Sequence, residues 1–199
     1  MFLGRWKALG ETVEGCEFLT PDRYLSRTQA IQLFHAFLLQ VRESGGLVYL
    51  VQNESDGFFA THFADALMTS LHIPASNLVS IDQDASLPLS ILLKKSDLLI
   101  TICVNAPSPE TNAATAMAKS HDIPIIALTG NPLDHPLYGQ GDLNLHFSGN
   151  DKTLIATAQY TLLNAVIDEW TYNSSPLFMQ QKLPSIGTRP QNLATGLRL

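Results

Sequence analysis

The amino-acid sequence predicts an α/β protein in which a five-stranded parallel sheet lies between two layers of helices. Short apolar runs rich in β-branched residues alternate with helical segments through the middle of the chain, and the connections between them are short. Repeated strand–helix–strand units of this kind build a three-layer αβα sandwich, as in flavodoxin-like and Rossmann-like folds. The 199 residues are 45% hydrophobic, which suits one domain with a sizeable core.

Periodicity and end signals predict the individual elements in chain order. Apolar residues recur at helical spacing over 30–41, and Gly45 and Gly46 end that helix. An apolar strand follows at once over 47–51. The same signals predict further strands at 78–81, 98–103 and 124–129, and helices at 57–72, 86–95 and 109–121.

The end of the chain shows weaker patterns. Polar and apolar residues alternate over 143–147, which predicts a peripheral edge strand half covered by helices. Asn150 or Asp151 then caps a long helix that reaches about Tyr172 and offers a natural oligomer face. From Ser174 onward proline and glycine interrupt any long element. We therefore expect an N-terminal extension with a helix (1–24), one domain (25–172) and an irregular C-terminal tail (173–199).

Composition narrows the functional classes. Twelve basic and eighteen acidic residues give a formal net charge of −6, which argues against direct binding of nucleic acid or of anionic membranes. No apolar run could cross a bilayer, and residues 1–9 lack the apolar core of a secretory signal, so we expect a cytoplasmic protein. Cys16 and Cys103 are expected to be reduced thiols. No dinucleotide, P-loop or hydrolase motif follows a strand, and we expect no cofactor and no metal.

The most informative stretch is 98–111, where an apolar strand ends in a polar loop that opens directly onto a helix. Ser108 is the expected N-cap, and Pro109 occupies the first helical position, where its missing N–H costs nothing. Backbone N–H groups at such a helix start point at any phosphate that rests on the loop. The same signals also describe an ordinary capped helix without a ligand, so the pattern leaves both interpretations open.

Short stretches elsewhere carry a family resemblance. They are DLLITI at 97–102, IIALTG at 125–130, HFA at 62–64 and DLNL at 142–145, together with Asn53. With the order of elements, they resemble the sugar isomerase (SIS) family, in the branch of phosphoheptose isomerases and DiaA-type initiator-associating proteins, over most of residues 30–170. The resemblance implies that a phosphorylated sugar or similar small anion binds across the carboxyl ends of the strands, usually between subunits of a homodimer or homotetramer.

Two loops depart from that family's pattern. Members of the family usually carry a glycine-rich turn after the first strand, but this chain has QNESD at 52–56. The carboxylates of Glu54 and Asp56 repel a phosphate unless they face away, by about 1–4 kcal/mol per close pair. In the second loop, CVNAPS at 103–108, only the last serine of the family's hydroxyl residues survives. The residues that we expect to line the ligand site are Asn53, Ser55, Asp56, Asn105, Ser108 and Thr111.

The catalytic positions implied by the resemblance are also altered. Aldose–ketose isomerisation needs a base to move a proton between C1 and C2, and an acid or a metal to polarise the carbonyl. The glutamate, glutamine and histidine of the heptose isomerases correspond to Ala66, Ala156 and Asn164 here. His62 is retained, but one histidine does not supply the three or four ligands that zinc requires. Asp65 lies on the same helical face as His62, where it either replaces the base or forms a surface pair.

Three functions therefore remain open. The first is a noncatalytic, regulatory SIS-domain protein that binds a phosphorylated sugar or related carbohydrate derivative. The second is a DiaA-type oligomeric scaffold for a protein partner, favoured by Asn164 on the last helix and by Leu177 and Phe178 after it. The third is an active phosphoheptose-type isomerase that uses His62 and Asp65. Fold-level analogy does not separate the three, because function depends on the residues of the site.

Overall fold

The computed structural model of the chain describes residues 2–52, 57–78, 93–130 and 135–173. Its helices are α1 (Phe2–Glu14), α2 (Arg27–Ser44), α3 (Gly57–Ser70), α5 (Pro109–Ser120) and α6 (Lys152–Asn173). Its strands are β1 (Glu17–Leu19), β2 (Val48–Gln52), β3 (Ala75–Leu78), β4 (Leu98–Cys103), β5 (Ile125–Thr129) and β6 (Leu143–His146). No helix in these ranges has the length and apolar content needed to span a bilayer.

The described strands form one sheet in the order β1-β6-β5-β4-β2-β3. Strands β2 to β6 are parallel to one another, whereas β1 runs antiparallel to β6. The chain moves from β2 out to β3 and then returns past β2 to β4, which is the strand order of flavodoxin-like folds. The predicted parallel sheet is therefore confirmed, and one antiparallel strand is added to it.

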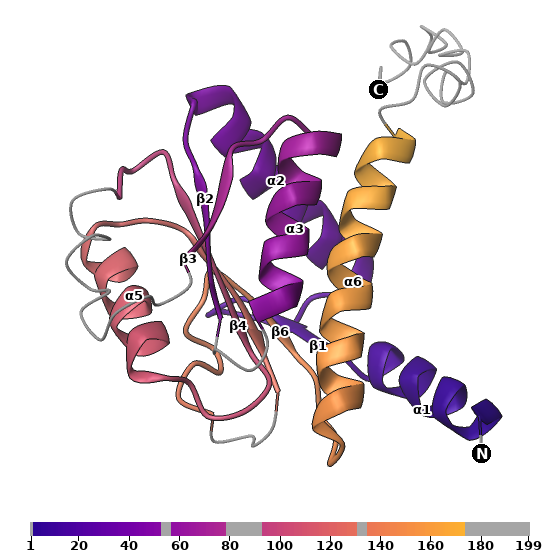
Figure 1. Cartoon of the computed structure of the whole chain (residues 1–199). Coiled ribbons are helices and arrows are strands. Elements are labelled where there is room, and N and C mark those ends of the chain that lie inside the picture. Colours follow the sequence, from indigo (N-terminus) through magenta and orange to yellow (C-terminus); the bar gives the residue numbers. More distant parts are fainter. Residues whose placement is uncertain (1, 53–56, 79–92, 131–134, 174–199) are drawn as a thin grey trace, which may run out of the picture.

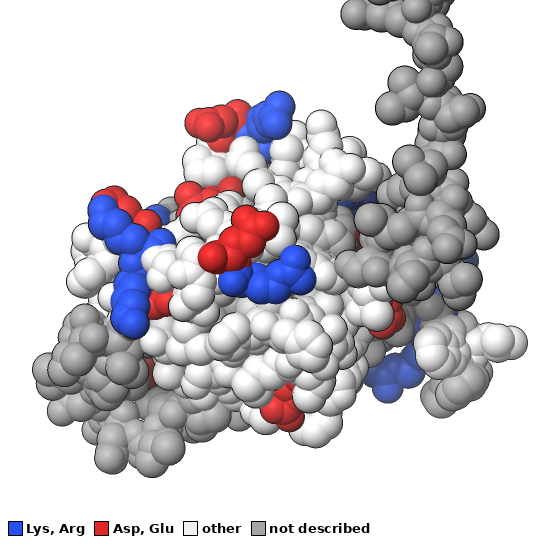
Figure 2. Space-filling view, turned by 90° about the horizontal axis from the view of Figure 1, so that it is seen from above, with Lys and Arg blue, Asp and Glu red and all other residues white. Residues whose placement is uncertain are grey.

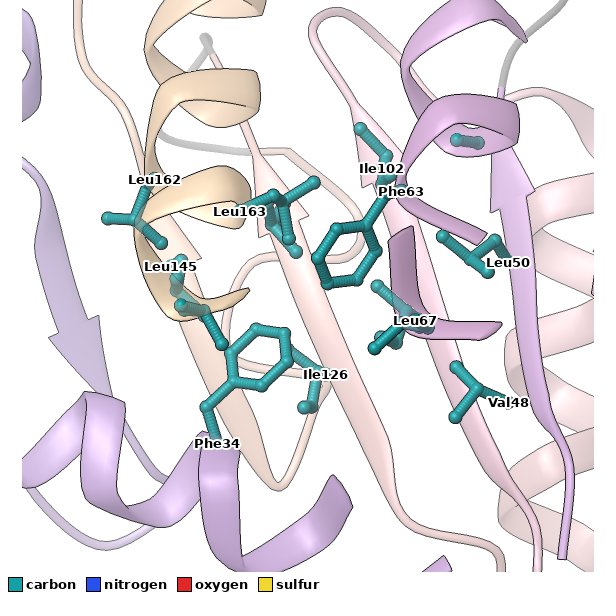
Figure 3. Close-up of a cluster of buried hydrophobic side chains, with 14 of the residues drawn as sticks. Phe34, Val48, Leu50, Phe63, Leu67, Ile102, Ile126, Leu145, Leu162 and Leu163 are labelled. Atoms are coloured by element: carbon teal, nitrogen blue, oxygen red, sulfur yellow. The ribbon is translucent and has the colours of Figure 1, made fainter. Parts of the chain in front are cut away.

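Helices cover both faces of the sheet (Figure 1). On one face α2, α3 and α6 enclose the larger core cluster, and on the other face α5 packs against Leu99 and Ile125. Figure 3 shows Phe34 and Phe63 between helices and strands in the larger cluster, and their ring centroids lie 6.4 Å apart in an edge-to-face contact. Leu163 of α6 completes this contact region and is fully buried. The predicted three-layer sandwich is therefore confirmed.

Capping residues explain where the helices begin and end. Ser26 and Gln29 form a capping box at the start of α2, which extends the helix beyond the predicted range of 30–41. Gly45 follows α2 with a φ of 66°, a left-handed conformation that glycine adopts without strain. Asp151 caps α6, as predicted, because its Oδ1 accepts hydrogen bonds from two backbone N–H groups at 2.9 and 3.2 Å.

The strand predicted at 78–81 is wrong in position. β3 begins at Ala75 and pairs with β2 from there, and residues 79–81 lie outside the described ranges. Ser76 and Asn77 remain only half-buried because β3, among the described strands, has a neighbour on one side alone. An edge strand with polar residues lacks the apolar run on which the prediction depended.

The helix predicted at 86–95 is not seen where the structure describes it. Residues 93–95 are not helical, and the rest of the range lies outside the described residues. The reason is a turn ahead of β4, in which the Lys94 N–H donates to Asp97 Oδ2 at 2.7 Å and the Leu47 N–H donates to Asp97 Oδ1 at 2.9 Å. The Asp97 carboxylate therefore connects the starts of β2 and β4.

Strand β6 is interior, although its alternating pattern predicts a peripheral edge strand. All four of its residues are buried because β1 pairs along its outer side. Asn144, which suggested a solvent-facing position, accepts from the Gly141 N–H at 2.8 Å and donates to the carbonyls of Gly141 and Leu19. Three residues of β1 are too few to show a period in the sequence, so this neighbour was not predicted.

Charged side chains of both signs lie next to one another on the face shown in Figure 2, and no extended patch of one sign is seen there. Two exposed ion pairs, Arg5–Asp151 and Lys95–Asp122, each have a nitrogen–oxygen distance of 3.2 Å. Exposed pairs of this kind contribute little to stability. The formal charge of −6 is therefore not concentrated on this face.

Candidate functional site

The topology makes the carboxyl ends of β2 and β4 the switch point of the sheet. These strands are direct neighbours, with Gln52 paired to Ile102, but the chain leaves β2 for α3 on one face and β4 for α5 on the other. Open α/β sheets bind ligands where neighbouring strands diverge in this way. Both helices begin at this edge, so the positive ends of two helix dipoles are directed toward it.

The start of α5 has the geometry that the sequence predicts. Ser108 is the N-cap, with φ −69° and ψ 160°, and its Oγ accepts from the Thr111 N–H at 3.2 Å. Pro109 occupies the first turn. Thr111 is fully buried, and its Oγ1 lies 3.0 Å from Ser108 Oγ. The hydroxyl of Thr111 therefore takes part in the cap, and its contact with a ligand stays a prediction.

Glu110 adds a carboxylate to the same helix start. A hydrogen bond from the Ser108 side chain is the main cause that lowers the pKa of Glu110, and a backbone hydrogen bond acts in the same direction. Negative charge is favourable at the first turn of a helix. A phosphate that binds here therefore competes with a carboxylate already present.

A buried histidine holds the loop after β4 in position. The carbonyl of Asn105, a predicted ligand residue, accepts a hydrogen bond from His135 Nε2 at 2.6 Å, and His135 Nδ1 accepts from the Leu137 N–H at 3.1 Å. Because Nδ1 is the acceptor, the ring proton belongs on Nε2. Sequence analysis assigned His135 no role, since a single histidine outside any motif carries no signal.

Gly130 allows the ends of β4 and β5 to approach closely. Its N–H donates to the Cys103 carbonyl at 2.8 Å, and a Cβ at this position would lie 2.3 Å from the Val104 carbonyl oxygen. Only a residue without a side chain fits at that distance. The glycine that ends the IIALTG stretch therefore shapes the start of the loop that leads to Ser108.

On the opposite face of the sheet, His62 of α3 contacts α6. Its side chain is exposed, its Nδ1 lies 3.2 Å from the Tyr160 hydroxyl, and the two rings meet edge-to-face at 5.4 Å. Tyr160 was not predicted as a site residue because the resemblance assigned roles only to the neighbouring turns of the helix. Asp65 is also exposed on α3, and its role as a substitute base stays a prediction.

The three residues that the resemblance sets at catalytic positions lie on these two helices. Ala66 is half-buried on α3 and Ala156 is buried on α6. The Asn164 side chain donates through Nδ2 to the Tyr160 carbonyl of its own helix at 2.9 Å. Methyl and amide groups do not ionise near neutral pH, so the side chains of these three residues are unsuited to general acid or base catalysis.

The residues around His62, where α3 meets α6, do not fit a zinc ion. Zinc sites use three or four histidine, cysteine or carboxylate ligands, and no group of three such side chains gathers in the part of the chain that the structure describes. The imidazole of His62 is hydrogen-bonded to Tyr160 instead. His62 alone therefore does not make a zinc site here.

Gln159 is a further residue that sequence analysis missed. It is 1% exposed, and its Nε2 donates to the Cys103 carbonyl at 3.3 Å, which fixes α6 against the carboxyl end of β4. Its Oε1 has no hydrogen-bond partner among the described residues. A buried polar atom without a partner is costly, so this position is unusual for a side chain that only fills space.

Several predicted site residues lie outside the described ranges. They are Asn53, Ser55 and Asp56 of the predicted ligand site, and Leu177 and Phe178 of the predicted partner surface. Their roles stay predictions. The structure brings Asn105, Ser108 and Thr111 together in one loop and cap, and it places His62 against Tyr160 of α6, whereas the Asn164 side chain bonds to its own helix.

A cavity of about 490 Å³ lies at the opposite edge of the sheet, beside the starts of β5 and β6. Its polar groups already hold local structure. Asp142 Oδ2 accepts from the Ile125 N–H at 2.8 Å, and Lys119 is hydrogen-bonded to Gln140. This cavity therefore does not belong to the switch point.

No protein-family model and no curated protein sequence matches the chain. Solved structures do resemble it. Phosphoheptose isomerase GmhA from Neisseria gonorrhoeae has a TM-score of 0.68 at 20% identity over 84% of this chain and 92% of its own. The sugar isomerase domain of an RpiR transcription factor from Sphaerobacter thermophilus has a TM-score of 0.65 at 19% identity over 90% of this chain and 94% of its own. The Vibrio vulnificus NanR protein complexed with ManNAc-6P has a TM-score of 0.66 at 14% identity, and the match covers 88% of this chain and 62% of that chain.

The fold is thus that of the sugar isomerase (SIS) domain. Within that class, the chain shares the architecture of the phosphoheptose isomerases, which confirms the fold that the short sequence stretches imply. At 20% identity or less the likeness establishes architecture, and activity depends on the residues of the site.

Proposed function

We propose that this protein binds a phosphorylated sugar at the carboxyl ends of β2 and β4 and does not isomerise it. The observation that carries the proposal is the cap of α5: Ser108 ends the loop that follows β4 and caps a twelve-residue helix at the switch point of the sheet. Backbone N–H groups and the helix dipole favour a phosphate there. The sugar then extends from the phosphate toward α3.

Proteins of similar architecture support a role in binding without turnover. The structure of NanR holds ManNAc-6P, and a SIS domain forms part of an RpiR transcription factor. Proteins of this architecture therefore include a transcription factor and a protein complexed with a sugar phosphate. We infer a regulatory role for this chain on the same grounds.

The altered catalytic positions support the second half of the proposal. Ala66 and Asn164 stand where the heptose isomerases carry a glutamate and a histidine. Moving a proton between C1 and C2 requires a base within hydrogen-bond reach of the sugar. The remaining candidates are His62, which is hydrogen-bonded to Tyr160, and the exposed Asp65, and we propose that these two do not act as an acid and base pair. We propose further that the protein acts as a homodimer or homotetramer, which light scattering would test.

Thermal unfolding with added ligand tests the binding function. A ligand at 100 times its Kd stabilises the folded state by about 2.7 kcal/mol. For a chain of this size we expect ManNAc-6P or sedoheptulose 7-phosphate to raise Tm by about 5–10 °C. Unphosphorylated ManNAc is the matched control and should give a much smaller shift.

Two outcomes contradict the proposal. If no phosphosugar raises Tm or binds by calorimetry, the DiaA-type scaffold function replaces it. If sedoheptulose 7-phosphate binds and is converted to an aldose, the protein is an isomerase, and the variants His62→Ala and Asp65→Asn identify its base.

A further inference from the structure

Four aromatic rings gather where the start of α3 meets α6. Phe59 stacks on Tyr160, with ring centroids 4.8 Å apart and an interplanar angle of 28°. Phe58 meets Phe59 edge-to-face, with ring centroids 6.0 Å apart, and its centroid lies 6.3 Å from that of the His62 ring, which is tilted by 35°. Phe58 is 72% exposed, whereas Phe59 and Tyr160 are half-buried and Phe59 also packs against the core, so one side of this aromatic cluster faces solvent. Clustered exposed rings, unlike single ones, indicate a binding surface.

Neighbouring contacts connect the ring cluster to the switch point. Gln159 precedes Tyr160 on α6, and its side chain donates to the carbonyl of Cys103, the last residue of β4. Gln52, the last residue of β2, accepts through Oε1 from the Ala60 N–H at 2.9 Å, one residue after Phe59. The rings are therefore attached, through these two contacts, to the ends of both strands at which we place the phosphosugar.

We infer that Phe58, Phe59 and Tyr160 form the surface on which the sugar ring of the ligand packs, with His62 as a hydrogen-bond donor to a sugar hydroxyl. This inference rests on the proposed function. Sugar sites combine aromatic surface with a few polar groups that set orientation, and the C–H face of a pyranose offers apolar area to an aromatic ring. The ligand class is thus a phosphorylated pyranose rather than a small linear phosphate ester.

Tyr160 sets the orientation of His62. When the phenol hydroxyl donates to Nδ1, the proton of the neutral imidazole lies on Nε2, which then points away from Tyr160 as a donor. A sugar hydroxyl accepts this hydrogen bond. In this tautomer Nε2 carries the ring proton and has no free lone pair, so His62 acts as a hydrogen-bond donor to the sugar and not as a base.

Calorimetry with ManNAc-6P and with inorganic phosphate tests the inference. Phe58→Ala removes an exposed ring without disturbing the core, and we expect it to weaken ManNAc-6P binding by about tenfold. Binding of inorganic phosphate should stay within about twofold of the wild type, because phosphate makes no ring contact. Tyr160→Phe keeps the stacked ring but removes the hydroxyl, and it should weaken ManNAc-6P binding by about three- to tenfold. Met68→Ala, an exposed apolar residue near the other end of α3, is the matched control and should change neither affinity.

The outcomes distinguish failure of the ring surface as the sugar site from failure of the proposed function. If wild-type protein binds ManNAc-6P and Phe58→Ala binds it equally well, the ring surface is not the sugar site, although the proposed function stands. If Phe58→Ala instead changes the oligomeric state in light scattering and leaves affinity unchanged, the rings contact a second copy of the chain and the inference is overturned. If the wild type binds no phosphosugar, the proposed function and the inference fail together.

Discussion

Replacing Ser108 with aspartate separates the observed role of this residue, which is to cap α5, from its proposed role in ligand binding. Its Oγ accepts from the Thr111 N–H at 3.2 Å. An aspartate carboxylate accepts the same hydrogen bond, because aspartate and serine are about equally good N-caps. Ser108→Asp therefore keeps the helix while it adds a negative charge beside the phosphate. Ser108→Ala has the opposite effect, since it removes the cap and adds no charge.

The sizes of the two effects follow from this geometry. Two charges about 4 Å apart interact by about 1 kcal/mol in water and by about 4 kcal/mol near a protein surface. Ser108→Asp is therefore expected to weaken phosphosugar binding by roughly 5- to 1,000-fold. It keeps the N-cap but replaces the hydrogen bond from Ser108 to Glu110 with a like-charge contact at an exposed site, so we expect it to lose less stability than Ser108→Ala. Ser108→Ala should cost about 1 kcal/mol of stability, or about 2–4 °C in Tm for a chain of this length.

Calorimetry with ManNAc-6P and thermal unfolding without ligand measure both effects. Ser26→Asp is the matched control, because it makes the same substitution at the N-cap of another helix, α2. Helix α2 packs on the face of the sheet opposite to α5. This control should bind like the wild type. Equal affinities of Ser108→Asp and wild type would refute the placement of the phosphate, as would an equal loss in Ser26→Asp.

Three further variants test the site and its support. Glu110→Gln should strengthen ManNAc-6P binding about two- to fivefold at low salt, because the native carboxylate competes with the phosphate for the start of α5. Calorimetry at low and high salt measures the affinity of this variant. An affinity equal to that of the wild type would contradict this prediction. Burial lowers the pKa of His146, so the unfolded state binds protons more readily and stability should fall as the pH drops below about 6.5. Urea unfolding at pH 5 and pH 7.5 should show a smaller difference for His146→Gln than for the wild type, and an equal difference would exclude this histidine as a cause. Gly130→Ala should destabilise the protein by about 1–3 kcal/mol because its Cβ would lie 2.3 Å from the Val104 carbonyl oxygen. Gly10→Ala, where the added methyl meets nothing within 4 Å, should not destabilise it, so equal losses for the two variants would contradict that reasoning.

Interior strands and capped helices could be predicted from the sequence because their signals are local. All six residues of β4 are buried, so it shows as an unbroken apolar run, and Ser108 and Pro109 mark the start of the next helix. β1 and β3 could not be placed in this way. Each is short and lies at an edge of the described sheet, where pairing with a neighbour, rather than periodicity, determines its position.

The site could be predicted only in part, for a related reason. Ser108 and His62 are identified by motifs within a few residues of them. The contacts of His135 with Asn105 and of Tyr160 with His62 join residues 30 and 98 positions apart. Contacts over such separations depend on how the helices and loops pack, and a single sequence does not record them.

The central claim is that the protein binds a phosphosugar at the switch point of the sheet and leaves it chemically unchanged. An NMR time course of sedoheptulose 7-phosphate with the purified protein tests both halves at once. We predict saturation transfer from the protein to the sugar protons, while the ketose signals keep their intensity. Growth of aldose signals, or the absence of any transfer, would contradict the claim.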